Sequence, residues 1–260
     1  MDQVIEQYLD LSVMFDSQNL DEVLHGFKYT LMLSVIAGAL SLIWGLVLAV
    51  LRQLPGRLLA PIRWLTIGYI DAFRGIPMLL VLLIIYGSLG ALYTQGVIPE
   101  WLGIPRWFGL PDPFWVGVMA ITITYGAYMA EVYRAGIEAV PPGQMEAARS
   151  LGMSHGQAMR FIIVPQAVRK VVPPLLNDFI ALMKDTSLVS VIGLIEVVQA
   201  GRDIQAETFN SSALTLGAIL FLIVTIPLAR LVDYLIARQG RKTGREGEAR
   251  QATGLPGAAG

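Results

Sequence analysis

The sequence has no cysteine, few histidines and little charge. The absence of cysteine among 260 residues excludes a disulfide framework, a thiol nucleophile and a cysteine-ligated zinc site. The two histidines, His25 and His155, are too few and too far apart for a histidine-rich cluster, so we expect no metal site. Charged residues make up 15%, against about 25% in soluble domains. That deficit argues against intrinsic disorder, and the net charge of −1 gives no reason to expect a nucleic-acid partner.

Apolar residues dominate instead, at 55% of the chain plus 26 glycines, with a mean hydropathy of +0.59. A bilayer core about 30 Å thick requires about 20 predominantly apolar residues per helix. The stretches that fit are Tyr29–Leu51, Leu79–Tyr93 extended back toward Trp64, Phe114–Tyr133, Val164–Met183 and Ala213–Ala237. A sixth stretch, Leu188–Ala200, is apolar but too short to cross, and six spans stay open as an alternative. The sequence therefore predicts an all-α integral membrane protein with about five transmembrane helices.

The distribution of basic residues predicts the orientation. Lysine and arginine gather between spans one and two, between spans three and four, and after span five, whereas the opposite loops hold only Arg106 and Arg202. Because basic residues stay on the cytoplasmic side, an odd number of spans places the N-terminus outside and the C-terminus inside. Residues 1–22 carry six acids and no lysine or arginine, the reverse of the basic start of a signal peptide.

The chain divides into three parts on this basis. We expect an extracytoplasmic N-terminal segment at residues 1–23, a transmembrane domain at 24–238 and a disordered cytoplasmic tail at 239–260 that is weakly attracted to membrane lipid. In the first span, small residues recur at four-residue steps: Ala37, Ser41, Gly45 and Ala49. Such ladders let helices approach closely in lipid, so we assign them to helix packing.

The loop at residues 141–165, between spans three and four, is the most informative segment. A first short helix can run over Pro142–Leu151, because proline is favoured in a first helical turn. Gly152 tolerates the left-handed conformation after a helix end. Ser154 and Gln157 have the spacing of a capping box for a second helix, which would run to about residue 164 before Pro165 starts the next span. A helix–turn–helix results that another protein's groove can accept, although a plain connector is the simpler alternative.

The same loop resembles the EAA loop of ATP-binding-cassette importer permeases. Its Glu146-Ala147-Ala148, Gly152, Ile162 and Pro165 match the family pattern E-A-A-x3-G-x9-I-x-L-P, with valine at the leucine position. Three further segments resemble the polar amino acid branch, the histidine, glutamate, glutamine and arginine type: Phe73–Pro77, Tyr128–Ile137 and Lys184–Gly193. The resemblance extends from about His25 to Arg238.

This resemblance implies a permease subunit of an ATP-driven importer in the cytoplasmic (inner) membrane of a prokaryote. The subunit would receive a polar amino acid from an external binding protein and pair with an identical or homologous second permease chain. Two ATPase subunits would bind the loop through Gln144, Glu146, Ala147, Ala148, Leu151, Gly152, Ile162 and Pro165. The chain has no G-x-x-x-x-G-K-[ST] phosphate loop. We therefore expect a transport subunit and not an enzyme, without a cofactor of its own, and with ATP and Mg²⁺ bound by its partners.

Ionisable residues in or near the spans are candidates for the substrate path, because charges at membrane depth are costly and usually face a bundle interior or a water-filled route. The candidates are Arg74, Lys184, Asp185, Thr186 and Ser187, although Lys184-Asp185 could equally be a structural pair. Two other pairs at three-residue spacing, Asp71 with Arg74 and Glu131 with Arg134, can form ion pairs on a helix face.

Two other classes of protein fit the sequence less well than the importer. A gradient-driven secondary amino acid transporter predicts an inverted repeat with matching broken helices, and no partner for the proline-interrupted fourth span is evident. A membrane-embedded enzyme requires a clustered catalytic set, which an isolated His155 does not provide.

Overall fold

The computed structural model describes residues 2–54 and 56–252, and within them all regular structure is helical. The predicted all-α fold class is therefore confirmed. The elements in chain order are α1 (Asp2–Leu9), α2 (Leu11–Met14), α3 (Ser17–Arg52), α4 (Ala60–Gly75), α5 (Met78–Thr94), α6 (Glu100–Gly103), the 3₁₀ helix η1 (Trp107–Gly109), α7 (Asp112–Glu138), α8 (Pro142–Ser150), α9 (His155–Ala158), the π-helical turn η2 (Met159–Ile163), α10 (Val164–Asp185), the 3₁₀ helix η3 (Thr186–Ile192), α11 (Val197–Thr208) and α12 (Ser212–Ala252).

Three of the predicted spans match helices that are long and apolar enough to cross a membrane: α3, α7 and the Ser212–Arg238 part of α12. The predicted second span is wrong as a single helix, because α4 and α5 meet at a bend of 109° and satisfy the criteria only as a pair. Proline disfavours helical backbone in the residue before it, and Ile76, just before Pro77, has ψ 131°. The predicted fourth span forms α10, which has 22 residues but is less apolar, so its crossing stays a prediction.

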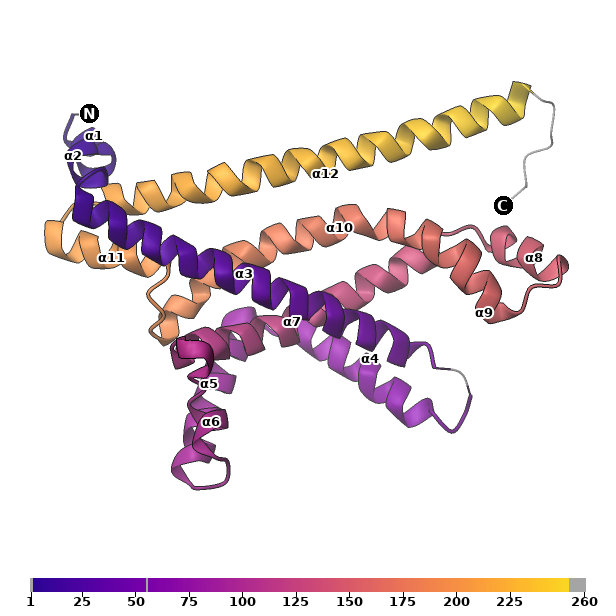
Figure 1. Cartoon of the computed structure of the whole chain (residues 1–260), viewed down its shortest axis with the longest axis horizontal. Coiled ribbons are helices and arrows are strands. Elements are labelled where there is room, and N and C mark those ends of the chain that lie inside the picture. Colours follow the sequence, from indigo (N-terminus) through magenta and orange to yellow (C-terminus); the bar gives the residue numbers. More distant parts are fainter. Residues whose placement is uncertain (1, 55, 253–260) are drawn as a thin grey trace.

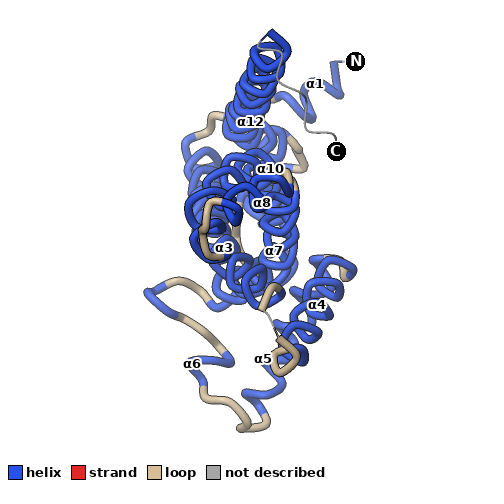
Figure 2. Tube along the Cα trace, turned by 90° about the vertical axis from the view of Figure 1, so that its right-hand side faces the viewer, coloured by secondary structure: helices blue, strands red, loops and turns tan. Residues whose placement is uncertain are grey.

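The long helices lie roughly along one common direction, with α5 and α6 projecting to the side (Figure 1). The end-on view places α12 at one edge of the bundle and α4, α5 and α6 at the opposite edge, with α3, α7 and α10 between them (Figure 2). The loop formed by α8 and α9 lies at one end of the bundle, while α1, α2 and α11 lie at the other (Figure 1).

Helix α7 is the centre of this arrangement, and its large side chains Phe114, Ile121 and Met129 are fully buried. Its contact with α3 is close enough to exclude side chains: a Cβ atom at Gly45 would lie 2.8 Å from the Cβ of Met129. The other ladder residues of α3 are buried as well, which agrees with the predicted packing role.

The N-terminal segment packs against the bundle, and the C-terminal segment extends the last helix. The N-terminal segment lies against the start of α12, where the Ser211 backbone N–H donates to the Gln7 carbonyl at 2.8 Å and the Asp10 N–H donates to Ser212 Oγ at 2.8 Å. At the other end we expected a disordered tail from residue 239, but α12 continues as helix to Ala252. No proline lies between residues 239 and 252, but Gly240, Gly244 and Gly247 disfavour helix, so local propensity does not explain this extension. Residues 253–260 of the predicted tail lie outside the described residues.

Candidate functional site

The turn between α8 and α9 has the geometry that the sequence predicts. Gly152 adopts φ +82°, the left-handed conformation that follows a helix end. Its N–H donates to the Arg149 carbonyl at 3.0 Å, and the Met153 N–H donates to the Ala148 carbonyl at 3.1 Å. These are the two hydrogen bonds of a Schellman motif, which satisfies the last carbonyls of α8 and sets the direction of the chain toward α9.

The second helix of the loop begins with the predicted capping box. The Gln157 N–H donates to Ser154 Oγ at 3.3 Å, and the Ser154 N–H donates to Gln157 Oε1 at 2.8 Å. The helix of the fourth predicted span, α10, begins at Val164, so Pro165 lies at its start as expected, and α9 and η2 lead into it without a break. Pro165 lies in the first turn of α10, where a missing N–H is tolerated, and the π-helical turn lies directly before it.

The predicted coupling residues divide into an outer and an inner set. Those exposed on the loop surface are Gln144, Glu146, Ala147, Leu151, Gly152 and Pro165. Ala148 is buried, and Ile162 packs partly buried against the inner cluster of Val140, Ile163 and Ala167. Sequence analysis missed Phe161, which is exposed on η2 with the Arg160 guanidinium 5.5 Å from its ring centre. The sequence feature that could have indicated it is an aromatic residue in the loop at residues 141–165.

The loop is firmly attached to both helices that carry it. Lys170 Nζ on α10 donates to the carbonyl of Ala139 at the end of α7. Gln166 Nε2 contacts Gln144 Oε1 on α8 at 3.4 Å, a link from α10 to the first loop helix. At Gly136 a Cβ atom would lie 2.0 Å from Cγ1 of Val171, so α7 and α10 touch directly. The end of α7, the loop and the start of α10 therefore form one packed unit.

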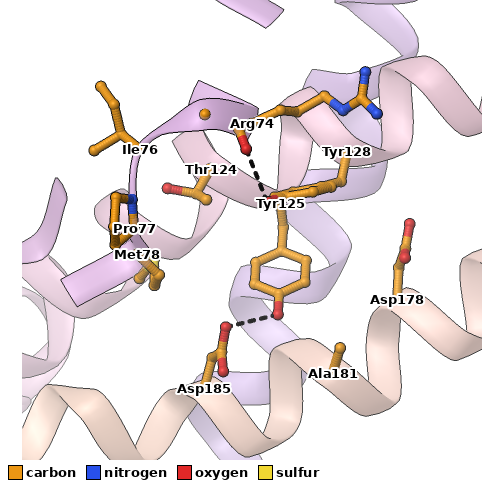
Figure 3. A pocket seen from close by; sticks show the side chains of 11 residues that line it. Arg74, Ile76, Pro77, Met78, Thr124, Tyr125, Tyr128, Asp178, Ala181 and Asp185 are labelled. Carbon is orange, nitrogen blue, oxygen red and sulfur yellow. Dashed lines mark hydrogen bonds between the residues drawn. The ribbon is translucent and has the colours of Figure 1, made fainter. Parts of the chain in front are cut away.

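A polar cavity of about 460 Å³ lies further along the same two helices, facing the break between α4 and α5 (Figure 3). Its lining comes from three directions: the chain break, one face of α7 and one face of α10. The lining residues are Arg74, Gly75, Ile76, Pro77, Met78, Thr124, Tyr125, Tyr128, Asp178, Ala181 and Asp185.

Only two of the five predicted substrate-path residues, Arg74 and Asp185, line this cavity. Lys184 is exposed and does not line it. Thr186 is buried and donates to the Met183 carbonyl at 2.7 Å, while the Ser187 hydroxyl donates to the Lys184 carbonyl at 2.8 Å. Neighbouring residues on a helix point in directions about 100° apart, and here that rotation directs Lys184 away from the cavity that Asp185 lines.

The cavity also contains polar residues that sequence analysis did not select. Tyr125 donates its hydroxyl to Asp185 Oδ2 at 2.8 Å, and Tyr128 donates to the Arg74 carbonyl at 3.3 Å (Figure 3). Asp178 has a buried Oδ2 with no hydrogen-bond partner among the described residues. The sequence feature that could have indicated Asp178 is its seven-residue spacing from Asp185, which puts the two aspartates on one face of α10.

A separate ion-pair network joins α3 to α7 near the loop at residues 141–165. Arg52 on α3 lies 2.6 Å from Glu131 on α7, and Glu131 also pairs with Arg134, as its spacing predicts. Arg134 in turn pairs with Glu138. The predicted pair of Asp71 with Arg74 does not form in the described part of the chain; the Arg74 guanidinium lies instead over the Tyr128 ring, 5.9 Å from its centre.

Comparison with known proteins places this architecture in a family. Residues 41–241 match the family described as "binding-protein-dependent transport system inner membrane component". The chain is 36% identical to the probable glutamine ABC transporter permease protein GlnM of Bacillus subtilis (strain 168), over 88% of this chain and 98% of that protein. It is 34% identical to the glutamate/aspartate import permease protein GltK of Escherichia coli O6:H1, over 85% of this chain and 94% of that protein.

A solved structure supports the same placement. The crystal structure of an amino acid ABC transporter with histidines matches with a TM-score of 0.73 and 34% identity, over 85% of this chain and 95% of that chain. The family match covers most of the chain, and the similar proteins are matched over nearly their full lengths. The chain therefore belongs to the family of binding-protein-dependent transport system inner membrane components.

Proposed function

We propose that this chain is the membrane permease subunit of an ATP-driven importer for a polar amino acid. The relatives named for glutamine and for glutamate/aspartate support the substrate class. The observation that carries the proposal is that the coupling loop and the polar cavity share the same two helices, α7 and α10. Family membership argues against the gradient-driven secondary transporter.

The loop at residues 141–165 of each permease chain docks one ATPase subunit. The two ATPase subunits bind ATP and Mg²⁺. Glu146 is the charged contact, since it is exposed and takes part in no ion pair among the described residues. Leu151 is 84% exposed and offers an apolar contact beside it. Truncation of an exposed apolar anchor costs binding energy only where a partner covers it, which makes Leu151 a good probe of docking.

Movement of the ATPases reaches the cavity through α7 and α10. The packed unit of α7, loop and α10 leaves little freedom for the loop to move alone, and close-packed interiors transmit displacement. The third wall of the cavity, at the α4–α5 break, is linked to α7 through the Tyr128–Arg74 contact. We infer that relative movement of this wall and the α7–α10 unit opens the cavity alternately to the two sides of the membrane.

The charges in the cavity favour particular amino acids. Asp178 and Asp185 contribute two carboxylates, and Arg74 contributes one guanidinium. An ammonium group would give the buried Oδ2 of Asp178 the partner that it lacks, and buried charges are costly unless they are paired. We therefore expect amino acids with neutral or cationic side chains to bind better than those with acidic side chains.

The remaining partners follow from the family and from the arrangement of the helices. An external amino acid-binding protein delivers the substrate, and a second permease chain, identical or homologous, completes the membrane unit. The coupling loop and the N-terminal helices lie at opposite ends of the bundle (Figure 1). With the loop in the cytoplasm, the N-terminus lies outside and the C-terminus inside the inner membrane of a prokaryote.

Affinity purification of the tagged chain from native membranes, with its stable partners identified by mass spectrometry, tests this function. We expect an ATPase subunit that carries a phosphate-loop lysine. The presence or absence of a second permease sequence then decides between a heterodimer and a homodimer. A homo-oligomer of this chain alone, under conditions that preserve membrane complexes, would contradict the proposal.

A further inference from the structure

The break between α4 and α5 presents a helix N-terminus to the polar cavity. Helix α5 has 17 residues and begins at Met78, with Pro77 in the cap position and no side chain bonded to its first N–H groups. Pro77 and Met78 both line the cavity. In the described part of the chain, the backbone N–H groups of Met78 and Leu79 have no hydrogen-bond acceptor. Free N–H groups and the positive end of the helix dipole together favour an anion at such a position.

A second observation at the same place points to a ligand. Thr124 on α7 is 2% exposed and lines the cavity, yet its hydroxyl has no hydrogen-bond partner among the described residues. Helical threonines commonly donate to the carbonyl four residues earlier, as Thr66 does to Ile62 at 2.8 Å and Thr225 to Phe221 at 2.8 Å. Figure 3 shows the Thr124 side chain directed toward the Pro77–Met78 end of the break. A buried hydroxyl left unpaired is costly, so a bound group that accepts its proton would stabilise the site.

The opposite wall of the cavity carries hydrogen-bond acceptors. Asp178 and Asp185 extend from α10, and the unpaired Oδ2 of Asp178 is an acceptor without a donor. The Arg74 guanidinium is directed over the Tyr128 ring and away from the Thr124 end (Figure 3). The cavity thus has donors at one wall and acceptors at the other, as a zwitterion requires.

We propose that the N-terminus of α5 and the Thr124 hydroxyl bind the α-carboxylate of the transported amino acid, with its α-ammonium directed toward Asp178. This assignment rests on the proposed function. The Met78 N–H and the Thr124 hydroxyl donate to the carboxylate oxygens, while Arg74 supplies long-range positive potential without a direct contact. Recognition of the carboxylate by the backbone does not depend on the substrate's side chain.

The test compares an amino acid with its α-carboxamide, in which the same position is neutral. Binding of radiolabelled L-arginine, L-glutamine and L-glutamate to the purified complex of this chain with its ATPase subunits identifies the best ligand, whose α-carboxamide is then measured. We expect the wild-type complex to bind the acid at least about tenfold more tightly than the amide, since hydrogen bonds to charged groups are strong.

The variant Thr124→Val removes the hydroxyl and keeps the shape of the side chain. We expect it to weaken binding of the acid about tenfold or more and to change binding of the amide much less, while Thr124→Ser retains most of the affinity. Thr122→Val is the matched control: Thr122 lies on the same helix and its hydroxyl also lacks a partner among the described residues, but it does not line the cavity. Its affinities should equal those of the wild type.

The outcomes separate this assignment from the proposed function. Equal binding of acid and amide by the wild type would overturn the carboxylate site, even if no variant could be purified. Equal losses for acid and amide in Thr124→Val, or equal losses in Thr122→Val, would overturn the role of the Thr124 hydroxyl. If none of the three amino acids binds to the wild-type complex or is transported by it, the proposed function fails instead.

Discussion

Replacing Gly152 should uncouple the loop from the ATPases by a purely conformational effect. Gly152 has φ +82°, and a Cβ atom added there would meet nothing within 4 Å. A side chain at this position therefore clashes with nothing. Its free-energy cost is that of holding a non-glycine residue in the left-handed conformation. That cost is about 1–2 kcal/mol for an ordinary L-residue and up to about 3 kcal/mol for a β-branched one, whereas asparagine is tolerated better. We expect the damage to increase in the order Asn, Ala, Val.

Strain of this size favours rearrangement of the turn, because the turn is exposed and depends on two Schellman hydrogen bonds. The reorientation of α8 relative to α9 would misplace Glu146 and Leu151 on the ATPase. Gly152→Val should therefore leave membrane insertion intact, while ATP-driven uptake in proteoliposomes falls strongly and ATP hydrolysis no longer responds to substrate. Gly156→Ala, also in open space but at negative φ, is the control and should behave as wild type. Normal uptake by Gly152→Val, or equal damage from Asn and Val, would refute the reasoning.

Three further predictions concern the stability of the purified protein. Glu131→Gln should lower the free energy of unfolding by roughly 1 kcal/mol, because it removes the charge that pairs with both Arg52 and Arg134. Thermal unfolding at low salt measures this, and the difference should shrink in high salt. Burial raises the pKa of Glu196 to about 7, so its contribution to stability is fully present below its ordinary pKa of 4.5 and is lost as the pH rises toward 7. Glu196→Gln should remove that decline; an unchanged pH dependence would contradict this. A Cβ atom at Gly26 would lie 2.8 Å from the backbone carbon of Glu196, so Gly26→Ala should cost about 1–3 kcal/mol. Gly68→Ala, in open space inside α4, should not destabilise, because alanine favours helix more than glycine does.

Sequence reasoning succeeded where local rules determine structure. The Pro142 start, the Gly152 stop and the Ser154–Gln157 capping box depend on residues within a few positions of one another. The ladder of small residues in α3 also succeeded, because close helix approach in lipid requires small side chains at helical spacing.

The break at Pro77 shows where hydropathy misleads. The segment from Trp64 to Tyr93 is apolar enough for one long span, and an average over many residues takes no account of a single proline. The proline itself was visible, and its effect on Ile76 could have been predicted. The angle of 109°, and with it the exposure of the α5 N-terminus to the cavity, depends on how the helices pack and was not predictable locally.

The cavity could be predicted only in part for the same reason. Arg74 and Asp185 were found as charges near span ends, but Lys184, selected for the same reason, is exposed and does not line the cavity. Thr124 and Tyr125 carry no signal in the sequence, since their role comes from the meeting of α7 with α10 and the α4–α5 break. Only the tertiary arrangement shows that the Thr124 hydroxyl lacks a partner among the described residues.

Uptake of a radiolabelled amino acid into proteoliposomes that contain the purified complex tests the central claim most directly. The vesicles are loaded with ATP or with a non-hydrolysable analogue, with and without an imposed proton or sodium gradient, and the external binding protein is added with the substrate. The account predicts uptake that requires hydrolysable ATP, does not depend on the gradient and is lost in Gly152→Val. Uptake driven by the gradient without ATP would contradict it.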